Sequence, residues 1–239
     1  FHDFEFSRAR PDATEGHFLT SGEPRFGPDG AFLGYRGVGR NVTDLVQARE
    51  RIAQLAYTDL LTGLANRTSL GPALEHAVQL ARRHEKKLAI MFLDLDGFKQ
   101  INDQHGHDAG DRLLTEVADR LRVCLRTSDL VARLGGDEFI VLLEQVQDTN
   151  YVQGVARRLL AEIARPYSLV AGEESRVSAS IGISMLPDDA GDPRTLMKHA
   201  DTAMYCAKQS GKNGYRFFAG ESGDSTTQTP GPDHRGAGR

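Results

Sequence analysis

The stretches LAIMFLDLDG (88–97) and RLGGDEFIVLL (133–143) decide the fold of this chain. Each contains an unbroken apolar run of strand length, which indicates a strand buried on both faces. Asp94 and Asp96 close the first run. Because side chains alternate along a strand, both carboxylates lie on one face while Leu95 points the other way. The pattern predicts a buried strand that ends in two acids.

The second stretch begins with a glycine pair followed by two acids. Gly135 and Gly136 suit a tight hairpin, because glycine reaches positive φ freely and lets a phosphate group approach the backbone. Asp137 and Glu138 then open the strand. If the two strand ends are neighbours, Asp94 and Asp137 converge, and Mg²⁺ prefers such carboxylates together with substrate phosphates and water. A solvated loop acid is the alternative for either residue alone, but the glycine pair favours a site.

Helices and strands alternate around these two stretches. Apolar residues recur at helical spacing in four segments, at 70–81, 113–125, 152–163 and 196–207. Further strand-like runs occupy 177–185 and 215–218. This alternation predicts an α/β domain with a central sheet and flanking helices.

The N-terminal part has a different pattern. The runs FEFSRA (4–9), GHFLT (16–20) and FLGYRGVG (32–39) are separated by the turn signals SGEP and GPDG. Short runs of this kind, rich in aromatic residues and bounded by turns, predict antiparallel strands and therefore a small N-terminal β segment.

A helical pattern follows the N-terminal strands. Leu45 and Ile52 stand seven residues apart, as do Ala48 and Leu55, which matches a two-heptad seam. So short a seam fits an ordinary surface helix as well as a helix that pairs with its own copy. At the other end of the chain, residues 220–239 have almost no large apolar side chain, and we expect a disordered tail.

Composition bounds the kind of partner. The chain has 239 residues, 39% hydrophobic and 26% charged, in the range of globular proteins, and its formal charge of −4 argues against broad nucleic-acid binding. No apolar stretch approaches the roughly 20 residues of a membrane span, so we expect no membrane insertion.

Cys124 and Cys206 lack metal-ligand spacing, and we expect both to be small buried hydrophobic residues.

The motifs together resemble the GGDEF diguanylate cyclases over roughly residues 57–219. Besides the pentapeptide at 135–139, the chain has the family's other motifs in the family's order: DLLTGLANR (59–67), DLDGFKQINDQHGHDAGD (94–111), ASIGIS (179–184) and AMYCAKQSGKN (203–213). The resemblance implies a palm-like α+β fold with a central, mostly antiparallel sheet, similar to nucleotidyl cyclases and polymerases.

The resemblance also implies a metal site for Mg²⁺, with Mn²⁺ as a substitute. Asp94 and Asp137 match the two metal carboxylates, the Leu95 carbonyl matches a backbone ligand, and Glu138 completes the metal shell. Asp137, Glu138 and Lys99 are the implied catalytic residues. Taken without the resemblance, a lysine at such a position fits solvated helix surface better.

Substrate binding is implied for a further group of residues. Asn102 and Asp111 match the pair that reads guanine, and a carboxylate suits the guanine N1 and N2 hydrogens, which adenine does not present as a pair. The remaining implied substrate contacts are Gly135, Gly136, Lys208 and Lys212. Lys212 stands where the family more often has arginine, so a bidentate fork is lost while the charge is kept.

The implied reaction joins two GTP molecules into cyclic di-GMP and releases two pyrophosphates. Because one domain holds one GTP, a two-fold symmetric product implies a homodimer. The alternative is a catalytically silent GGDEF module that binds GTP or cyclic di-GMP and signals by protein contacts. A mixed-nucleotide cyclase is disfavoured by Asp111.

An RxxD sequence precedes the glycine pair. Arg126 and Asp129 resemble the family's product-inhibition site in composition and spacing, and Arg158 resembles its secondary arginine, although the adjacent Arg157 fits as well. Arginine presents a planar fork to guanine or phosphate, and aspartate accepts from guanine. A surface ion pair between Arg126 and Asp129 is the alternative.

Upstream, residues 21–44 resemble the closing strands of a PAS sensor domain, with Asn41 in place of the usual aspartate. The alternative is an irregular β segment. We therefore expect a PAS-like part at 1–43, a connecting helix at 44–57, a GGDEF domain at 58–219 and the tail at 220–239. The catalytic part is expected to be cytoplasmic, with any membrane attachment of a longer parent chain upstream of Phe1.

Overall fold

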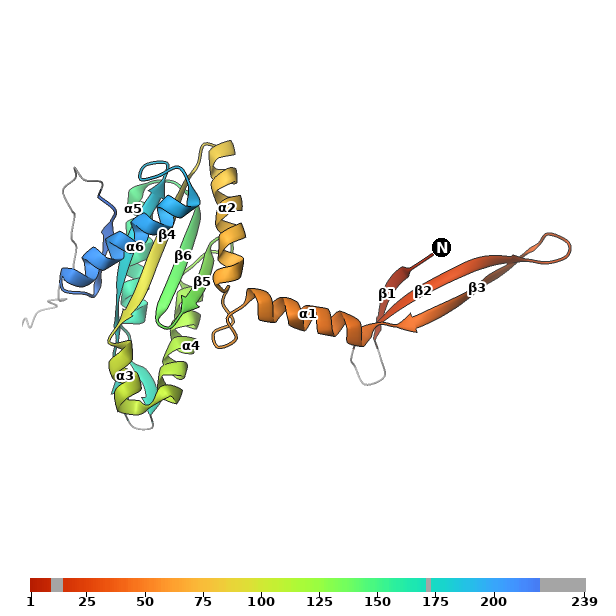
Figure 1. Cartoon of the computed structure of the whole chain (residues 1–239), viewed down its shortest axis with the longest axis horizontal. Helices are drawn as coiled ribbons and strands as arrows, with labels where there is room; N and C mark the ends of the chain where they lie inside the picture. Colours follow the sequence, from red (N-terminus) through yellow and green to blue (C-terminus); the bar gives the residue numbers. More distant parts are fainter. Residues whose placement is uncertain (10–14, 171–172, 220–239) are drawn as a thin grey trace, which may run out of the picture. The chain divides into compact units, whose positions relative to one another are not determined.

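The structure is a computed structural model that describes residues 1–9, 15–170 and 173–219 (Figure 1). Its contacts divide the chain into two units, Phe1–Ala56 and the part that begins at Tyr57. The predicted tail at 220–239 lies outside the described residues. No helix in the described part is long and apolar enough to cross a membrane.

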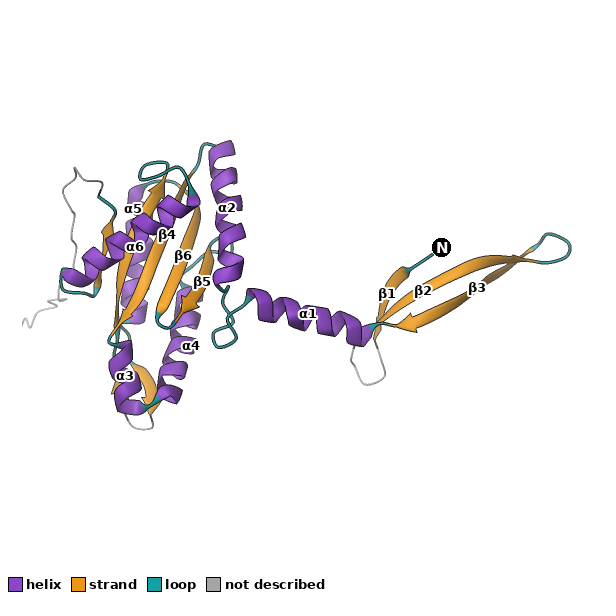
Figure 2. Cartoon of the chain, viewed as in Figure 1, coloured by secondary structure: helices purple, strands orange, loops and turns teal. Residues whose placement is uncertain are grey.

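The first unit is an antiparallel sheet followed by a helix (Figure 2). Its strands are β1 (Phe4–Ala9), β2 (Glu15–Phe26) and β3 (Phe32–Asn41), in that order, and helix α1 follows at Thr43–Tyr57. The predicted strands are confirmed, but the turn predicted at SGEP is wrong, because β2 runs through it. Pro24 is tolerated there because β1 pairs only with Glu15–Thr20, which leaves that part of β2 at a sheet edge.

Asn41 connects β3 to α1. Its Oδ1 accepts hydrogen bonds from the backbone N–H of Thr43 at 3.0 Å and from the Thr43 hydroxyl at 2.6 Å. Both bonds need an acceptor and no charge, so the amide serves in place of an aspartate. Along α1, the seam residues Leu45, Ile52 and Leu55 are exposed. The helix can therefore still pair with its own copy or be an ordinary surface helix, and both predictions stay open.

The second unit is built on a five-stranded sheet in the order β10-β9-β4-β6-β5, with a separate two-stranded ribbon β7-β8. The strands span β4 Lys87–Asp96, β5 Leu130–Gly135, β6 Glu138–Val146, β7 Tyr167–Val170, β8 Glu173–Ser175, β9 Ser178–Leu186 and β10 Gly214–Phe217. The β9-β10 pair is parallel, and the other pairs of the large sheet are antiparallel. The predicted mostly antiparallel central sheet is confirmed.

Helices cover both faces of the sheet (Figure 2). They span α2 Arg67–Arg83, α3 Phe98–His105, α4 His107–Val123, α5 Thr149–Ile163 and α6 Pro193–Gln209. Leu88, Ile90 and Phe92 of β4 pack in the cluster with α2 and α6, whereas Met91 and Leu93 pack in the cluster with α4 and α5. The strict alternation directs the next even-numbered residues of β4 toward the α6 side.

Two details of the helices differ from prediction. Cys124 is buried as expected, but Cys206 is exposed. The buried stripe of α6 includes Ala203, Met204 and Ala207, and position 206 lies off that face. Helix α4 ends at Val123, before the predicted limit at residue 125.

Candidate active site

The acids of β4 and β6 meet at one end of the sheet. Asp94 is paired with Glu138 in the β4-β6 ladder, and the Leu95 N–H donates to the Asp137 carbonyl at 3.3 Å. The two strand ends are therefore neighbours, so the backbones that carry Asp94 and Asp137 adjoin. Leu95 itself is buried in the opposite face of the sheet. The two strand ends are thus neighbours, as the predicted convergence requires.

Asp94 is the most enclosed carboxylate of the group, with 8% of its surface exposed. Its Oδ2 lies 2.6 Å from Nζ of Lys208, which α6 brings over this face. Burial raises the pKa of Asp94, and the charges of Asp137 and Asp96 raise it further, while Lys208 opposes the rise. Negative charge is thus concentrated here and only partly neutralised, which suits a cation.

A cavity of about 360 Å³ opens beside these carboxylates. Its lining includes the predicted residues Asp94, Leu95, Lys99, Asp137, Lys208 and Lys212. The other lining residues are Asp96, Gly97, Phe98, Gln100 and Asp103. Carboxylates and three lysines facing one open space form a site that can take an anionic ligand together with a cation.

The donor set fits a divalent metal ion. The side chains of Asp94 and Asp137 and the Leu95 carbonyl supply hard oxygen atoms, which Mg²⁺ and Mn²⁺ prefer. Within residues 1–9, 15–170 and 173–219, no three acidic, histidine or cysteine side chains gather closely enough to enclose an ion. An ion here would be completed by water and phosphate oxygens, as is usual for Mg²⁺.

The glycine hairpin beside the acids is held by a residue that the sequence analysis missed. Gly135 and Gly136 have φ values of 138° and 54°, which glycine adopts without strain. Arg133 donates from Nε and Nη2 to the Gly136 carbonyl, at 3.0 and 2.8 Å. Its Nη1 donates to both carboxylate oxygens of Asp59, at 3.0 and 3.1 Å. Arg133 therefore ties the hairpin to the segment that follows α1.

Asp59 also organises its own turn. Its Oδ1 accepts from the backbone N–H and the hydroxyl of Thr62, at 2.9 and 2.6 Å, and these bonds close the turn. Burial is the largest influence on this carboxyl and raises its pKa. The hydrogen bonds from Thr62 and the interaction with Arg133 outweigh it and hold the pKa below the usual value.

Asp96 lies on the same face as Asp94, as predicted, but has a different surrounding. Its two oxygens accept from the hydroxyls of Ser180 and Ser178 at 2.9 and 2.8 Å, and one also accepts from the Asn213 N–H at 3.1 Å. These contacts fix the loop that carries Lys212, where φ is 62° at Lys212 and 45° at Asn213. Left-handed backbone at residues other than glycine costs free energy, and the bond from the Asn213 N–H to Asp96 helps to hold it here.

The predicted guanine-reading residues lie on α3 and α4 and are not part of the cavity lining. Asn102 is on α3 and Asp111 on the first turns of α4. Within the described part of the chain, Oδ1 of Asn102 is buried and has no hydrogen-bond partner. A buried acceptor without a partner is costly, and this one lies against Gly110 of α4.

The residues of the RxxD sequence gather at the far end of α4. Oδ2 of Asp129 accepts from the Arg126 N–H at 3.0 Å, and the Arg126 guanidinium lies 4.5 Å above the Tyr151 ring. Arg158 donates to the Cys124 carbonyl at the end of α4. Among the ion pairs of the described residues there is none between Arg126 and Asp129, and Oδ1 of Asp129 is buried without a partner.

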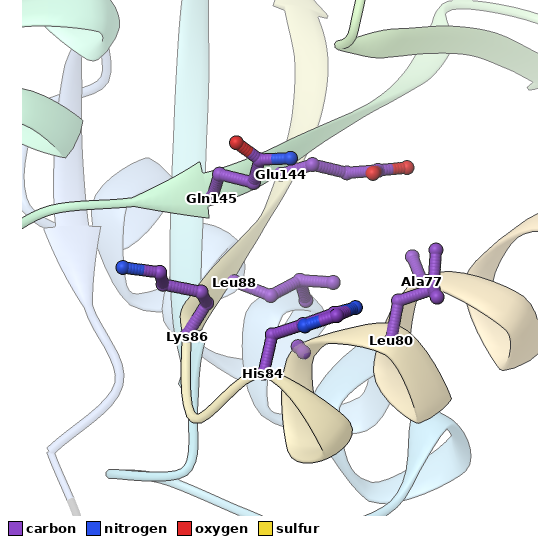
Figure 3. Close-up of a pocket in the computed structure, with 8 residues that line it drawn as sticks. Ala77, Leu80, His84, Lys86, Leu88, Glu144 and Gln145 are labelled. Atoms are coloured by element: carbon purple, nitrogen blue, oxygen red, sulfur yellow. The ribbon is translucent and has the colours of Figure 1, made fainter.

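A second cavity of about 360 Å³ lies at the opposite end of β4 (Figure 3). Figure 3 shows His84 and Lys86 from the α2-β4 connection on one side and Glu144 and Gln145 of β6 on the other, with Leu88 between them. Apolar side chains from α2 form much of the remaining wall. Its lining has one carboxylate and no glycine hairpin, so it lacks the chemistry of the acidic site.

Comparison with known proteins agrees with this geometry. Residues 56–214 match the family described as Diguanylate cyclase, GGDEF domain. The chain is 47% identical over 176 residues to the bifunctional diguanylate cyclase/cyclic di-GMP phosphodiesterase MucR of Pseudomonas aeruginosa, covering 74% of this chain and 25% of MucR. It spans about a quarter of the length of this and similar curated relatives.

Two solved structures share the fold. The GGDEF domain of TpbB (YfiN) from Pseudomonas aeruginosa is 41% identical with a TM-score of 0.67, covering 68% of this chain and 95% of that one. The coiled coil and GGDEF domain of DgcB from Caulobacter crescentus, in complex with c-di-GMP, is 28% identical with a TM-score of 0.66, covering 75% and 93%.

Proposed function

Because the chain belongs to the GGDEF family of diguanylate cyclases, we propose that its residues 58–219 condense two GTP molecules into cyclic di-GMP. The observation that carries this proposal is the acidic cavity, where Asp94 and Asp137 adjoin beside Lys99, Lys208 and Lys212. Carboxylates serve a divalent ion and lysines serve a triphosphate, and both are needed at one place for transfer to an α-phosphate.

The chain's own residues divide the work of each half-reaction. Lys99, Lys208 and Lys212 orient the triphosphate and offset its charge. Asp137, at the start of β6, receives the proton from the attacking 3′-hydroxyl, with Glu138 beside it in the metal shell. Asp94, Asp137 and the Leu95 carbonyl would hold Mg²⁺ or Mn²⁺, which would supply charge stabilisation at the reacting phosphate. Lys212 cannot make the bidentate contact of an arginine, so it binds the triphosphate more weakly but still contributes its charge.

The reaction requires two copies of the domain. Each copy brings its own acidic cavity, and each product bond joins the 3′-oxygen of one nucleotide to the α-phosphate of the other. A two-fold symmetric product is therefore made at an isologous contact, with each copy supplying half of the site. Activity should depend on dimerisation, for which the exposed seam of α1 is the candidate contact.

The proposal is tested by incubating the purified chain with GTP and Mg²⁺ and separating the nucleotides by chromatography. Cyclic di-GMP and pyrophosphate should accumulate, and a chelator should stop the reaction. The rival function, a silent module that binds nucleotide and signals by contact, requires nucleotide binding without any product. The chain keeps the two acids Asp94 and Asp137 and the glycine pair, so its sequence does not favour the silent module.

Base selection gives a prediction for Asp111. Replacing it with serine should lower the preference for GTP over ATP about tenfold, because a carboxylate that accepts from guanine N1 and N2 becomes a small neutral group. The ratio of kcat/KM for the two nucleotides measures the change. An unchanged ratio would mean that guanine is recognised elsewhere.

Product inhibition is proposed at Arg126, Asp129 and Arg158. Support comes from the absence of an Arg126–Asp129 ion pair among the described residues, which leaves the Arg126 guanidinium without a carboxylate partner there. Arg158 donates to the Cys124 carbonyl at the end of α4, and the adjacent Arg157 stays the alternative.

The inhibitory site is tested with Arg126→Ala. The initial rate should stay within about twofold of the parent, while cyclic di-GMP accumulates to a higher final level, because the guanidinium fork that holds the product is gone. Inhibition by added cyclic di-GMP should not be competitive with GTP. Equal inhibition of variant and parent would reject the site.

The first unit is proposed to be the end of a PAS-like sensor, with residues 1–43 as its strands and 44–57 as the connecting helix. Support comes from the antiparallel order of β1, β2 and β3 and from the Asn41 acceptor that joins β3 to α1. A signal would then reach the cyclase through α1. The catalytic part is proposed to be cytoplasmic, where GTP is available.

A further inference from the structure

Gly110 is buried where α4 packs against α3. Gly106 alone joins the two helices, with a φ of 83°, so that the chain reverses sharply and the first turn of α4 faces α3 (Figure 1). A Cβ atom on Gly110 would lie 2.0 Å from Oδ1 of Asn102 and 2.9 Å from its Cγ. No side chain fits at position 110 while the Asn102 amide stays in place.

We propose that Gly110 is a positioning residue that holds open the place of the Asn102 amide and thereby sets the affinity for the guanine base. This inference rests on the proposed function, because it concerns the nucleotide that the cyclase would bind. The amide is the group whose Oδ1 is buried without a partner in the described part of the chain. Because Oδ1 lies against Gly110, the amide nitrogen of this half-buried side chain is the end left to contact the guanine edge.

The geometry separates an effect on binding from an effect on folding. With alanine at position 110, the amide oxygen would have to retreat from 2.0 Å to about 3.4 Å, the start of ordinary contact. The atoms that move are the end of one side chain, so the packing of the two helices need not change. The remaining contact, Cε2 of Phe98 at 3.3 Å, requires a few tenths of an ångström. Alanine is also a better helix former than glycine.

A displacement of this size removes one directed hydrogen bond to the base, since such bonds weaken steeply outside 2.7–3.2 Å. The triphosphate contacts lie in the acidic cavity, whose lining does not include Asn102. Gly110→Ala should therefore weaken binding of the guanine base and leave binding of the triphosphate unchanged. A variant that was merely misfolded would lose both.

The test measures binding of 3′-deoxy-GTP, which lacks the attacking hydroxyl and cannot react, to the purified chain with Mg²⁺. Gly110→Ala should raise its Kd about tenfold, the value of one hydrogen bond, and leave the Kd of inorganic triphosphate unchanged. In an Asn102→Ala background, Gly110→Ala should cause no further change, because the group that it displaces is absent. Gly154→Ala on α5 is the matched control, since a Cβ there meets nothing within 4 Å.

The outcomes show whether the role of Gly110 or the proposed cyclase function is wrong. If the parent chain fails to bind 3′-deoxy-GTP, the proposed function is wrong. If the parent binds and Gly110→Ala binds equally tightly, the role of Gly110 is wrong while the function stands. If Gly110→Ala weakens binding equally in both backgrounds, or also weakens triphosphate binding, its effect is a general structural one and the positioning role is rejected.

Discussion

Asp137→Ala should lower cyclic di-GMP formation by about a thousandfold or more while leaving thermal unfolding nearly unchanged. The carboxylate is proposed both to hold the metal ion and to accept the proton of the 3′-hydroxyl, and loss of either role removes stabilisation made in the transition state. The fold should survive because Asp137 is only partly buried and precedes β6, whose paired and buried residues begin after it. Initial rates with GTP and Mg²⁺, together with a melting curve, measure the two effects.

The matched control is Asp119→Ala, which removes an exposed carboxylate on α4 that pairs with Arg122. It should keep full activity, since surface ion pairs of this kind contribute little. Turnover by Asp137→Ala within tenfold of the parent would remove Asp137 from the chemistry. Loss of activity together with a large fall in melting temperature would instead indicate a structural role.

Arg133→Ala should reduce both stability and turnover. The side chains of Arg133 and Asp59 are 10% and 21% exposed, so removal of the arginine leaves a mostly buried carboxylate without its cation and the Gly136 carbonyl without two donors. Breaking a pair of this kind costs about 2–4 kcal/mol, equivalent to roughly 5–15 °C in melting temperature for a domain of this size. The loosened hairpin should also lower turnover by the folded protein, because Asp137 follows it directly.

Arg133→Lys keeps the charge but not the fork and should recover part of the stability and little of the turnover.

The pH dependence of the unfolding free energy tests the Asp59–Arg133 pair. Because the folded pKa of Asp59 lies below its ordinary value of 3.8, its stabilisation is complete above that value and is lost as the pH falls through the lower folded pKa. The difference in unfolding free energy between the parent and Asp59→Asn should therefore shrink below about pH 4. A constant difference down to pH 2 would contradict the pairing.

Local patterns predicted the strands because strand formation depends on short-range rules, whereas the convergence of the acids also needed the two strand ends to be neighbours. Alternation along β4 fixes Asp94 and Asp96 on one face, and antiparallel pairing with β6 brings Asp137 to the same end. The exposure of Cys206 could also have been predicted from the sequence. The buried stripe of α6 runs through Ala203 and Ala207, and position 206 is not on it.

Other features depend on contacts between distant segments and leave no local signal. Arg133 reaches Asp59 because the segment after α1 bridges to β5 at Ala65 and Ala132, far apart in the sequence. The SGEP turn was wrong for a similar reason, since pairing with β3 overrides the local preference of Gly22 and Pro24.

We propose that the acidic site joins two GTP molecules between two copies of this chain. The most direct measurement is the rate of cyclic di-GMP formation per mole of protein as the protein concentration is raised, with Asp137→Ala in parallel. We predict that the specific activity of the parent rises with concentration and then levels as the dimer saturates, while the variant stays near zero. Bound GTP with no cyclic di-GMP at any concentration would contradict the account and leave a nucleotide-binding module in its place.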